Sequence, residues 1–231
     1  TLLASSAASD VYKRQPYVAE IGLFNSPTLT NNLETLFWVR DILEKGPIWF
    51  AEKGTGGNKG FHSFSVSGRV KEPGVKVAPA GITIQELIDK YCGGMKEDHI
   101  FKGYLPGGAS GGILPASMNK IPLDYGSKEL TDAGCFLGSA AIVVLSDKDN
   151  MKDVALNLLK FFEEESCGQC TPCRVGTEKT VKLMKEKIWN KEKLADLSEV
   201  MSQASICGLG QAATNPLNSV LKYFGNEISY E

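Results

Sequence analysis

The sequence predicts an α+β fold, with a small sheet in the middle of the chain and helices toward its end. Two observations carry this prediction. Short apolar or alternating segments separated by turn residues run through residues 61–146, whereas a 3.6-residue periodicity takes over from Asn150. The chain has 231 residues, 42% of them hydrophobic, and is therefore long enough for one large domain or two modest ones.

Charge and hydropathy exclude two classes of function. The 25 basic and 27 acidic residues leave a net charge of −2, and no basic run is interleaved with aromatic residues. Such a chain has no long-range attraction to nucleic acid or to an anionic membrane surface. The longest apolar stretch, at residues 140–145, is far too short to cross a bilayer. We therefore expect neither nucleic-acid binding nor direct membrane insertion.

Residues 1–15 differ in composition from the rest of the chain. Their sequence, TLLASSAASDVYKRQ, is rich in small residues, lacks an initial methionine, and lacks the apolar core of a secretory signal. We interpret this segment as a non-native leader joined to a C-terminal fragment of a longer protein. A natural disordered arm is the alternative.

Residues 16–60 begin as an extended segment and then become helical. Apolar residues recur at helical spacing from Leu33 to Leu43, and the pattern stops at Gly46 and Pro47. The glycine-rich stretch GTGGNKG at residues 54–60 indicates a flexible joint or a turn.

The middle of the chain predicts one helix on a small sheet. The helix TIQELIDKY begins at Thr83, which forms a capping box with Glu86 three residues later. Residues 106–115, PGGASGGILP, hold four glycines and suit a loop that packs near a ligand or a partner. Strands are expected at residues 62–70, 101–105 and 140–145.

From residue 150 onward the pattern predicts four short helices with brief connections, which is typical of a small bundle. The first contains Val154, Leu158, Phe161 and Phe162, the second residues 177–188, the third Leu194, Leu197, Val200 and Met201, and the fourth residues 216–224.

Four of the six cysteines form the most informative motif. Cys167, Cys170 and Cys173 follow one another as C-x2-C-x2-C, and Cys207 comes much later. Three cysteines within seven residues do not suit three separate disulfides. The three-plus-one arrangement is typical of a [4Fe–4S] cluster, to which one loop supplies three thiolates. A structural zinc ion, which usually takes its ligands in two separated pairs, remains the alternative.

The residues around the run suit an anionic cluster. Thr171 followed by Pro172 indicates a helix N-cap and first helical residue, which places Cys173 in the first turn. The unpaired amides and positive end of a helix stabilise thiolates. Gly168 permits close approach of the backbone to inorganic sulfide. Arg174 either adds a positive charge beside the site or is an ordinary solvated residue.

The remaining candidates have simpler interpretations. Cys207 stands on a glycine-flanked turn just before another helix. A metal ligand needs such a tight turn of the backbone, whereas a core cysteine does not. Cys92 and Cys135 have no partner at ligand spacing and are interpreted as buried structural thiols. His62 and His99 are isolated and are interpreted as ordinary strand or surface residues.

These segments also resemble a known family. ESCGQCTPCRVGTEK (165–179) and SICGLGQAATNP (205–216) resemble the C-terminal cluster domain of the flavin- and NADH-binding (51 kDa-type) subunit of respiratory complex I. The same module occurs in NAD-reducing hydrogenases and NAD-dependent formate dehydrogenases. PTLTNNLET (27–35) is similar to the family segment that lines the FMN site. FSVSGRVKEPG (64–74) and residues 105–116 resemble its β-grasp domain.

The resemblance implies a division of the chain and a set of sites. Residues 16–60 would be a C-terminal remnant of the FMN-binding domain, residues 61–147 a β-grasp (SLBB-like) domain, and residues 148–231 a four-helix [4Fe–4S]-binding domain. The implied cluster ligands are Cys167, Cys170, Cys173 and Cys207. The implied FMN contacts are Asn31, Asn32 and Thr35, for which a turn and helix cap is the alternative.

The resemblance further implies an oxidoreductase. The full-length subunit would exchange a hydride between NAD(H) and FMN, and single electrons would pass through the cluster to a 2Fe–2S subunit and a catalytic subunit. Such a complex is cytoplasmic, at the inner face of the membrane in the case of complex I. The large N-terminal α/β domain of the family and a G-x-G-x-x-G motif are missing from this sequence. We therefore expect the fragment alone to be inactive, with an exposed apolar patch where the flavin domain would dock.

Within the family, GLGQAA (208–213) and LGSAAIVVL (137–145) look closer to the β subunits of NAD-dependent formate dehydrogenases. Complex I and NAD-reducing hydrogenase are the alternatives. Two hypotheses from other classes are a zinc-bound structural scaffold and a partner- or ligand-binding role for the middle domain.

Overall fold

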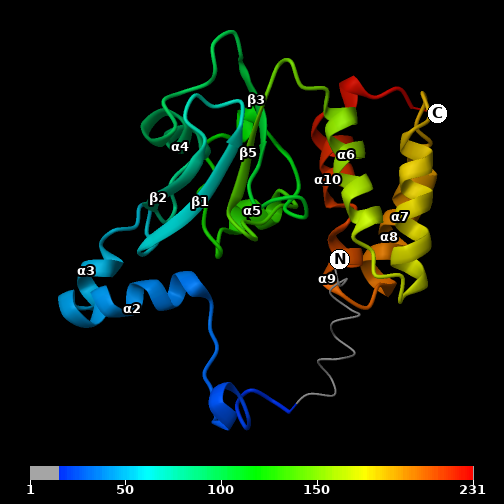
Figure 1. Ribbon diagram of the computed structural model, residues 1–231. Helices are drawn as coiled ribbons and strands as arrows, with labels where there is room; N and C mark the ends of the chain where they lie inside the picture. The colour runs from blue at the N-terminus through cyan, green and yellow to red at the C-terminus, as the bar shows by residue number, and fades with distance from the viewer. Residues whose placement is uncertain (1–15, 231) are drawn as a thin grey trace.

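The computed structural model describes residues 16–230, and the leader predicted at residues 1–15 lies outside the described residues. Figure 1 shows a twisted sheet on one side of the molecule and a group of helices on the other. This arrangement fits the predicted mixture of sheet and helices. Among the residues described, no helix is both long enough and apolar enough to cross a membrane.

The first described segment carries two α-helices and one 3-10 helix, none of which has a buried residue. The predicted helix is present as α2 (Leu33–Lys45), and the short 3-10 helix η1 (Leu23–Asn25) precedes it. Gly46 takes the left-handed backbone conformation, with φ of +89°, and ends α2. Pro47 then starts a further helix, α3 (Pro47–Ala51), that the apolar pattern did not predict. The apolar side chains of α2 are largely exposed, Leu33 and Leu43 among them.

The middle of the chain forms a five-stranded mixed sheet with strand order β2-β1-β5-β3-β4. The strands β1 and β5 run parallel, and the other neighbouring pairs run antiparallel. The three predicted strands are confirmed, and Pro73 and Gly74, a pair typical of turns, lead into a fourth strand. The bounds are β1 (Phe61–Gly68), β2 (Gly74–Pro79), β3 (Phe101–Leu105), β4 (Leu114–Pro115) and β5 (Ala141–Ser146).

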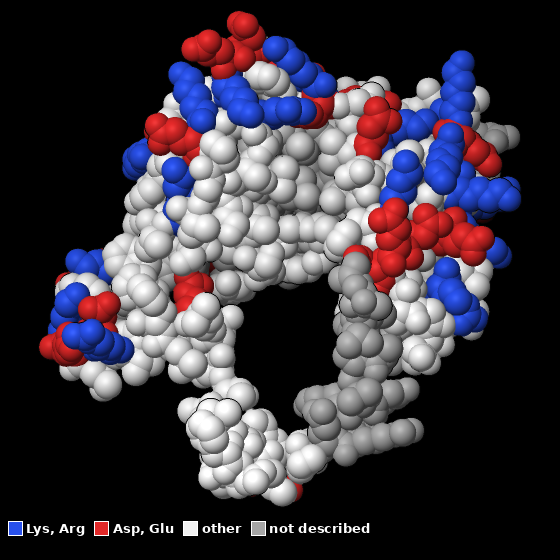
Figure 2. Space-filling view, viewed as in Figure 1, with Lys and Arg blue, Asp and Glu red and all other residues white. Residues whose placement is uncertain are grey.

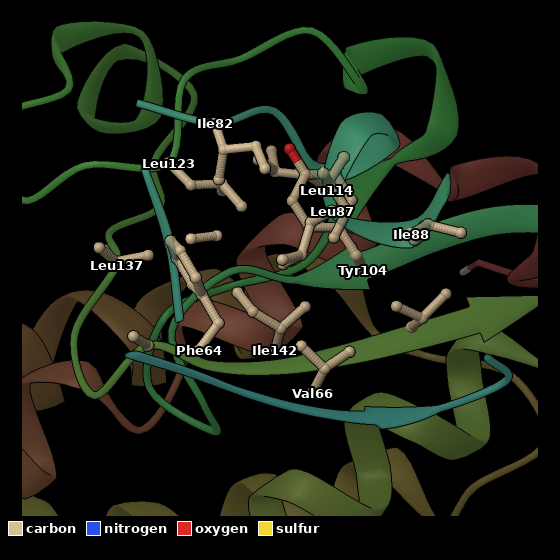
Figure 3. Close-up of a cluster of buried hydrophobic side chains, with 14 of the residues drawn as sticks. Phe64, Val66, Ile82, Leu87, Ile88, Tyr104, Leu114, Leu123, Leu137 and Ile142 are labelled. Carbon is tan, nitrogen blue, oxygen red and sulfur yellow. The ribbon is translucent and has the colours of Figure 1, made fainter. Parts of the chain in front are cut away.

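Alternation along β5 gives the sheet two apolar faces. Ile142 and Val144 belong to the core beneath α4, whereas Leu145 and the half-buried Val143 belong to the core shared with the later helices. Successive side chains of a strand point to opposite faces, so one strand serves both cores. Figure 3 shows the first core, where Phe64 of β1 and Tyr104 of β3, the two strands that flank β5, are among the fully buried rings.

Two helices accompany the sheet. In α4 (Ile84–Tyr91) the predicted capping box is confirmed, because the Thr83 hydroxyl accepts from the Glu86 amide and the Glu86 carboxylate accepts from the Thr83 amide. A second short helix, α5 (Lys128–Asp132), was not predicted. The Ser127 hydroxyl caps it by accepting from the amide of Leu130.

The last part of the chain is helical, as predicted. Four of its helices correspond to the four expected, and the short α9 is an addition. Trp189 fills the centre of their shared core, where its ring nitrogen donates to the carbonyl of Met184 at 2.9 Å. The helices are α6 (Met151–Glu164), α7 (Thr171–Met184), α8 (Lys191–Ala204), α9 (Gly208–Ala212) and α10 (Asn215–Tyr223), followed by the 3-10 helix η3 (Gly225–Glu227).

Ion pairs join the sheet to the helices. Arg69, just after β1, pairs with Asp149, just before α6, through Nη2 and Oδ1 at 2.6 Å. Lys102 of β3 pairs with Glu227 at 2.9 Å, and the same carboxylate accepts from the amide of Met151. These contacts, together with the shared core, fix the start of α6 against the sheet.

Candidate metal centre

The fold brings the four cysteines of the motif to one end of the helical region. Cys167 and Cys170 lie in the loop that leaves α6, Cys173 lies in the first turn of α7, and Cys207 is the N-cap residue of α9. Figure 1 shows the short α9 at the lower end of the helical group, next to the beginning of α7 and the end of α8. Residues 34 positions apart in sequence, Cys173 and Cys207, therefore meet at one place.

The start of α7 lies one residue earlier than predicted. Cys170 is the N-cap and Thr171 the first helical residue, so that Pro172 occupies the second position. Proline is tolerated there because the first amides of a helix have no carbonyl to bond. The main prediction is confirmed, since Cys173 lies in the first turn, where the helix end is positive.

Burial differs among the four thiols. Cys173 is buried, and Cys167, Cys170 and Cys207 are partly exposed. Burial raises the pKa of Cys173; the hydroxyl of Ser166 opposes that rise, and the charges of the three other thiols add to it. The contacts of α9 with α7 bring the segment of Cys207 to the start of α7 and to the loop of Cys167 and Cys170 before it.

Gly210 allows α9 to approach Cys173 closely. A Cβ atom added to Gly210 would lie 2.4 Å from the Ser205 hydroxyl and 2.8 Å from Cβ of Cys173. Both distances are too short for any real side chain, so glycine is required at this contact. The apposition of α9 and α7 thereby sets the position of Cys207 relative to Cys173.

Several hydrogen-bond donors face the sulfurs, and the sequence reasoning missed them. The Ser166 hydroxyl lies 3.4 Å from Sγ of Cys173, and the amide of Gln169 donates to Sγ of Cys167 at 3.5 Å. The amide of Ile206 lowers the pKa of Cys170 most, with burial opposing it. The available signal was a serine directly before Cys167 and another two residues before Cys207.

Arg174 fixes the loop that carries two of the thiols. Its guanidinium donates to the carbonyl of Gly168 at 2.5 Å and to the hydroxyl of Thr171 at 3.5 Å. Gly168 has φ of +78°, a conformation that glycine adopts without strain. The predicted positive charge beside the thiols is therefore present, and it also braces the loop.

The donor set suits an iron–sulfur cluster by its chemistry. Four thiols stand on two turns that meet at the start of α7, and amides and a hydroxyl face them. A four-iron cluster takes four thiolates and holds them farther apart than a tetrahedral zinc ion, whose Zn–S bonds measure about 2.3 Å. Within residues 16–230, no three histidine, cysteine or acidic side chains are close enough together to hold one metal ion.

The other cysteines and the histidines lie elsewhere. Cys92 and Cys135 are buried in the sheet core, as predicted, and burial raises the pKa of both, that of Cys135 to about 11. His62 lies in β1, 3.5 Å from the carboxylate of Asp124, and His99 bonds the hydroxyl of Ser146 at 2.8 Å. The structural interpretation of these residues stands.

The predicted flavin contacts form a helix cap. Oδ1 of Asn32 accepts from the amides of Glu34 at 2.9 Å and Thr35 at 3.4 Å, and Oδ1 of Asn31 accepts from the amide of Asn32. Asn32 and Thr35 also line a cavity of about 420 Å³ between α2 and β1. Figure 1 shows α2 well separated from α9, so the described residues do not bring this cap to the thiols.

The glycine-rich loop at residues 106–115 docks on the helical region. The side-chain amide of Asn215, at the start of α10, donates to the carbonyl of Ser110 at 2.9 Å. Ala109 and Leu209 pack against the same small apolar group, formed by Phe162, Met201 and Ala213. This loop thus links the sheet to the helices next to Cys207.

Charges of both signs are mixed on the visible face of the molecule. Figure 2 shows basic and acidic side chains interspersed over the helical region and at the top of the sheet region. No continuous basic patch appears in this view, in keeping with the balanced composition.

Comparison with known proteins identifies relatives of the chain. The family described as NADH-ubiquinone oxidoreductase-F iron-sulfur binding region matches residues 153–231. An F-type subunit of the NADH-quinone oxidoreductase of Rhizobium meliloti is 36% identical over 221 residues, which are 93% of this chain and 52% of that protein. The F-type subunit of the Streptomyces coelicolor enzyme is 36% identical over 220 residues, or 93% of this chain and 48% of that protein. The chain therefore spans about half the length of these relatives.

Solved structures also resemble this chain in fold. An NAD+-reducing [NiFe]-hydrogenase in the H2-reduced state has a chain that superposes with a TM-score of 0.76 at 30% identity. The match covers 93% of this chain and 37% of the hydrogenase chain. The air-oxidized state gives a TM-score of 0.76 at 28% identity.

Proposed function

The chain belongs to the 51 kDa-type (F-type) subunit family of NADH-quinone oxidoreductases, and from that premise we propose that Cys167, Cys170, Cys173 and Cys207 hold one [4Fe–4S] cluster. The observation that carries the proposal is the meeting of the C-x2-C-x2-C loop with Cys207 around the first turn of α7. When bound, such a cluster supplies one-electron chemistry. The site would serve in electron transfer between a flavin and further iron–sulfur centres.

The residues of this chain contribute electrostatics and rigidity. The amides of Ile206 and Cys173 favour the thiolate form of Cys170, and the positive start of α7 offsets the negative charge of four thiolates. Arg174 braces the loop and places a positive charge beside it. Gly210 keeps α9 close enough for the two ligand segments to bind one group.

The wider role concerns the full-length subunit. We propose that it exchanges a hydride between NAD(H) and FMN, with Asn31, Asn32 and Thr35 at the flavin. The free Nδ2 of Asn32 supports such a contact, because only Oδ1 is engaged in the helix cap. The proposed partners are a 2Fe–2S subunit and a catalytic subunit.

The host complex that we propose is an NAD-dependent formate dehydrogenase, because the sequences of residues 137–145 and 208–213 resemble those of its β subunits. Complex I and NAD-reducing hydrogenase are the alternatives, and the relatives named above favour them. We also propose the division of the chain into a flavin-domain remnant (16–60), a β-grasp domain (61–147) and a cluster domain (148–231). The five-stranded sheet with α4 on one face supports the middle assignment.

The decisive test is metal analysis of the chain purified without oxygen. We expect about four irons and four sulfides per chain, a brown colour and a paramagnetic signal on reduction. The variants Cys170→Ser and Cys207→Ser should each lose the intact cluster, since each removes one of its four thiolates. Cys92→Ala, at a buried cysteine outside the site, should keep the iron content of the parent chain.

Two results would overturn the proposal. Colourless protein with one zinc per chain would favour the structural scaffold. Equal loss of iron in Cys92→Ala and Cys170→Ser would show that the cysteines of the motif have no special role.

A further inference from the structure

Ser205 lies at the turn between α8 and α9, and its backbone is held on both sides. Its amide donates to the carbonyl of Met201 at 3.3 Å, which closes α8. Its carbonyl accepts from the side-chain amide of Gln211 at 3.0 Å, which ties the turn to α9. The residue is only 5% exposed, so water does not reach its hydroxyl freely.

The hydroxyl of Ser205 has no hydrogen-bond partner among residues 16–230. Among the buried hydroxyls of the described residues, only those of Ser205 and Thr214 lack one. Ser198, on the same helix, donates to the carbonyl of Leu194 four residues earlier. The Ser205 hydroxyl makes no such bond to the carbonyl of Met201, which accepts only from the Ser205 amide. A buried hydroxyl that finds no acceptor is destabilising, so an acceptor is expected at this place.

The surroundings of the hydroxyl show what that acceptor is. A Cβ atom on Gly210 would clash with the Ser205 hydroxyl and with Cβ of Cys173 together, so the hydroxyl faces the segment that carries Cys173. The amide of Ile206, on the same turn, lowers the pKa of Cys170 most, and the Ser205 hydroxyl lowers it further, although the hydroxyl and this sulfur do not have the geometry of a hydrogen bond. The two segments that meet here carry three of the four thiols. A cluster held by these thiols would therefore offer sulfur acceptors to the hydroxyl.

We propose that the Ser205 hydroxyl donates a hydrogen bond to a sulfur of the cluster, either the thiolate of Cys170 or an adjacent inorganic sulfide, and raises its reduction potential. This inference rests on the cluster proposed above. A hydrogen bond to sulfur draws negative charge away and favours the reduced state, which carries one more negative charge. Ser166, near Cys173, is the more exposed of the two site hydroxyls.

The test is a redox titration of the Ser205→Ala variant of the 231-residue chain, followed by its paramagnetic signal under anaerobic conditions. We expect iron content equal to that of the parent chain. At a fixed ambient potential the ratio of reduced to oxidised cluster should fall about tenfold, which is a shift of about 59 mV for one electron. Ser202→Ala, which removes an exposed hydroxyl of α8 that donates to the carbonyl of Glu199, should leave the ratio unchanged.

A second variant separates the hydroxyl from the volume of the side chain. Ser205→Thr keeps the hydroxyl and should keep the potential of the parent chain. Loss of the cluster in Ser205→Ala together with retention in Ser205→Thr would support the hydrogen bond as well. Loss of the cluster in both variants would overturn the inference, because the packing of the side chain, and not its hydroxyl, would then determine whether the cluster is retained. An unchanged potential in a fully loaded Ser205→Ala would also overturn it, whereas a parent chain without iron would overturn the proposed function itself.

Discussion

The sheet core and the thiol end of the helical region are built in different ways. The sheet closes its interior with protein atoms alone, and apolar side chains from its strands and from α4 are fully buried there. At the thiol end, the apolar group is small, consisting of Phe162, Met201 and Ala213. Beside it lie four thiols and a buried hydroxyl without a partner. The first interior is complete, and the second has the composition of a binding site.

The difference indicates that the sheet core and the thiol end are stabilised by different interactions. Burial of apolar surface stabilises the sheet whatever is bound elsewhere. At the thiol end the free energy of metal binding is also folding free energy, because the unfolded chain does not hold the ligands together. Removing iron should therefore loosen the first turn of α7 and α9 while the sheet stays folded.

The largest effect is expected in the sheet core. Leu87 of α4 is fully buried, and Leu87→Ala should lower the free energy of unfolding by about 2–5 kcal/mol through lost transfer energy and a cavity. Urea denaturation would measure it, with and without iron. The loss should be the same in both states. A loss of stability that depended on iron would show that the sheet core is not independent of the thiol site.

The matched control for Leu87 is Leu43→Ala on α2, where the side chain is 79% exposed. Surface changes of this kind stay within about 0.5 kcal/mol. A large loss at Leu43 would show that something covers the apolar side of α2 in the folded chain. That result would also place Leu43 in the contact between α2 and whatever covers it.

A smaller effect is expected where α9 meets α7. Gly210→Ala forces a Cβ atom into the Ser205 hydroxyl and Cys173, and should destabilise the helical region by about 1–3 kcal/mol. Gly208→Ala lies in the same helix with open space around it, and should change stability by less than about 1 kcal/mol. Iron per chain should fall in the first variant only. Equal iron in both would show that the approach of α9 does not control the site.

Local signals in the sequence predicted much of this fold. The capping box at Thr83 and the helical stripe from Leu33 could be predicted because each depends on residues within a few turns. The two-residue strand β4 and the helix α5 were missed, because their placement depends on contacts with distant segments. The parallel pairing of β1 with β5 joins residues far apart in sequence, such as Ser65 and Ala141, and no local pattern specifies it.

The candidate site shows the same division. The spacing of Cys167, Cys170 and Cys173 predicted a shared loop, and the structure brings Cys207 to it. The unpartnered hydroxyl of Ser205 could not be predicted, since it results from the close packing of α8, α9 and the start of α7. Spacing in sequence identifies ligands, whereas the groups that face them depend on tertiary structure.

The smallest effect concerns the joint between the two regions, at Asp149. Arg69 and, after it, the amide of Ser146 lower the pKa of this carboxyl to about 2, although burial acts in the opposite direction. The carboxyl of an unfolded chain has a pKa of about 3.9, so the pairing contributes stability above that pH and loses it as pH falls toward 2. Because the side chain of Arg69 is 43% exposed, we expect a contribution of about 1 kcal/mol rather than the full linkage value.

Asp149→Asn should therefore be less stable than the parent chain at pH 7, and the difference should shrink at about pH 3 and vanish near pH 2. Urea denaturation of the metal-free chain would measure this, because acid destroys iron–sulfur clusters. Asp41→Asn removes an exposed pair with Lys45 on α2 and should change stability by less than about 0.5 kcal/mol at either pH. If the sheet and the helices unfold in one transition in the parent chain and in two in Asp149→Asn, this carboxylate couples the two regions. A variant as stable as the parent at pH 7 would show instead that the shared apolar core alone holds them together.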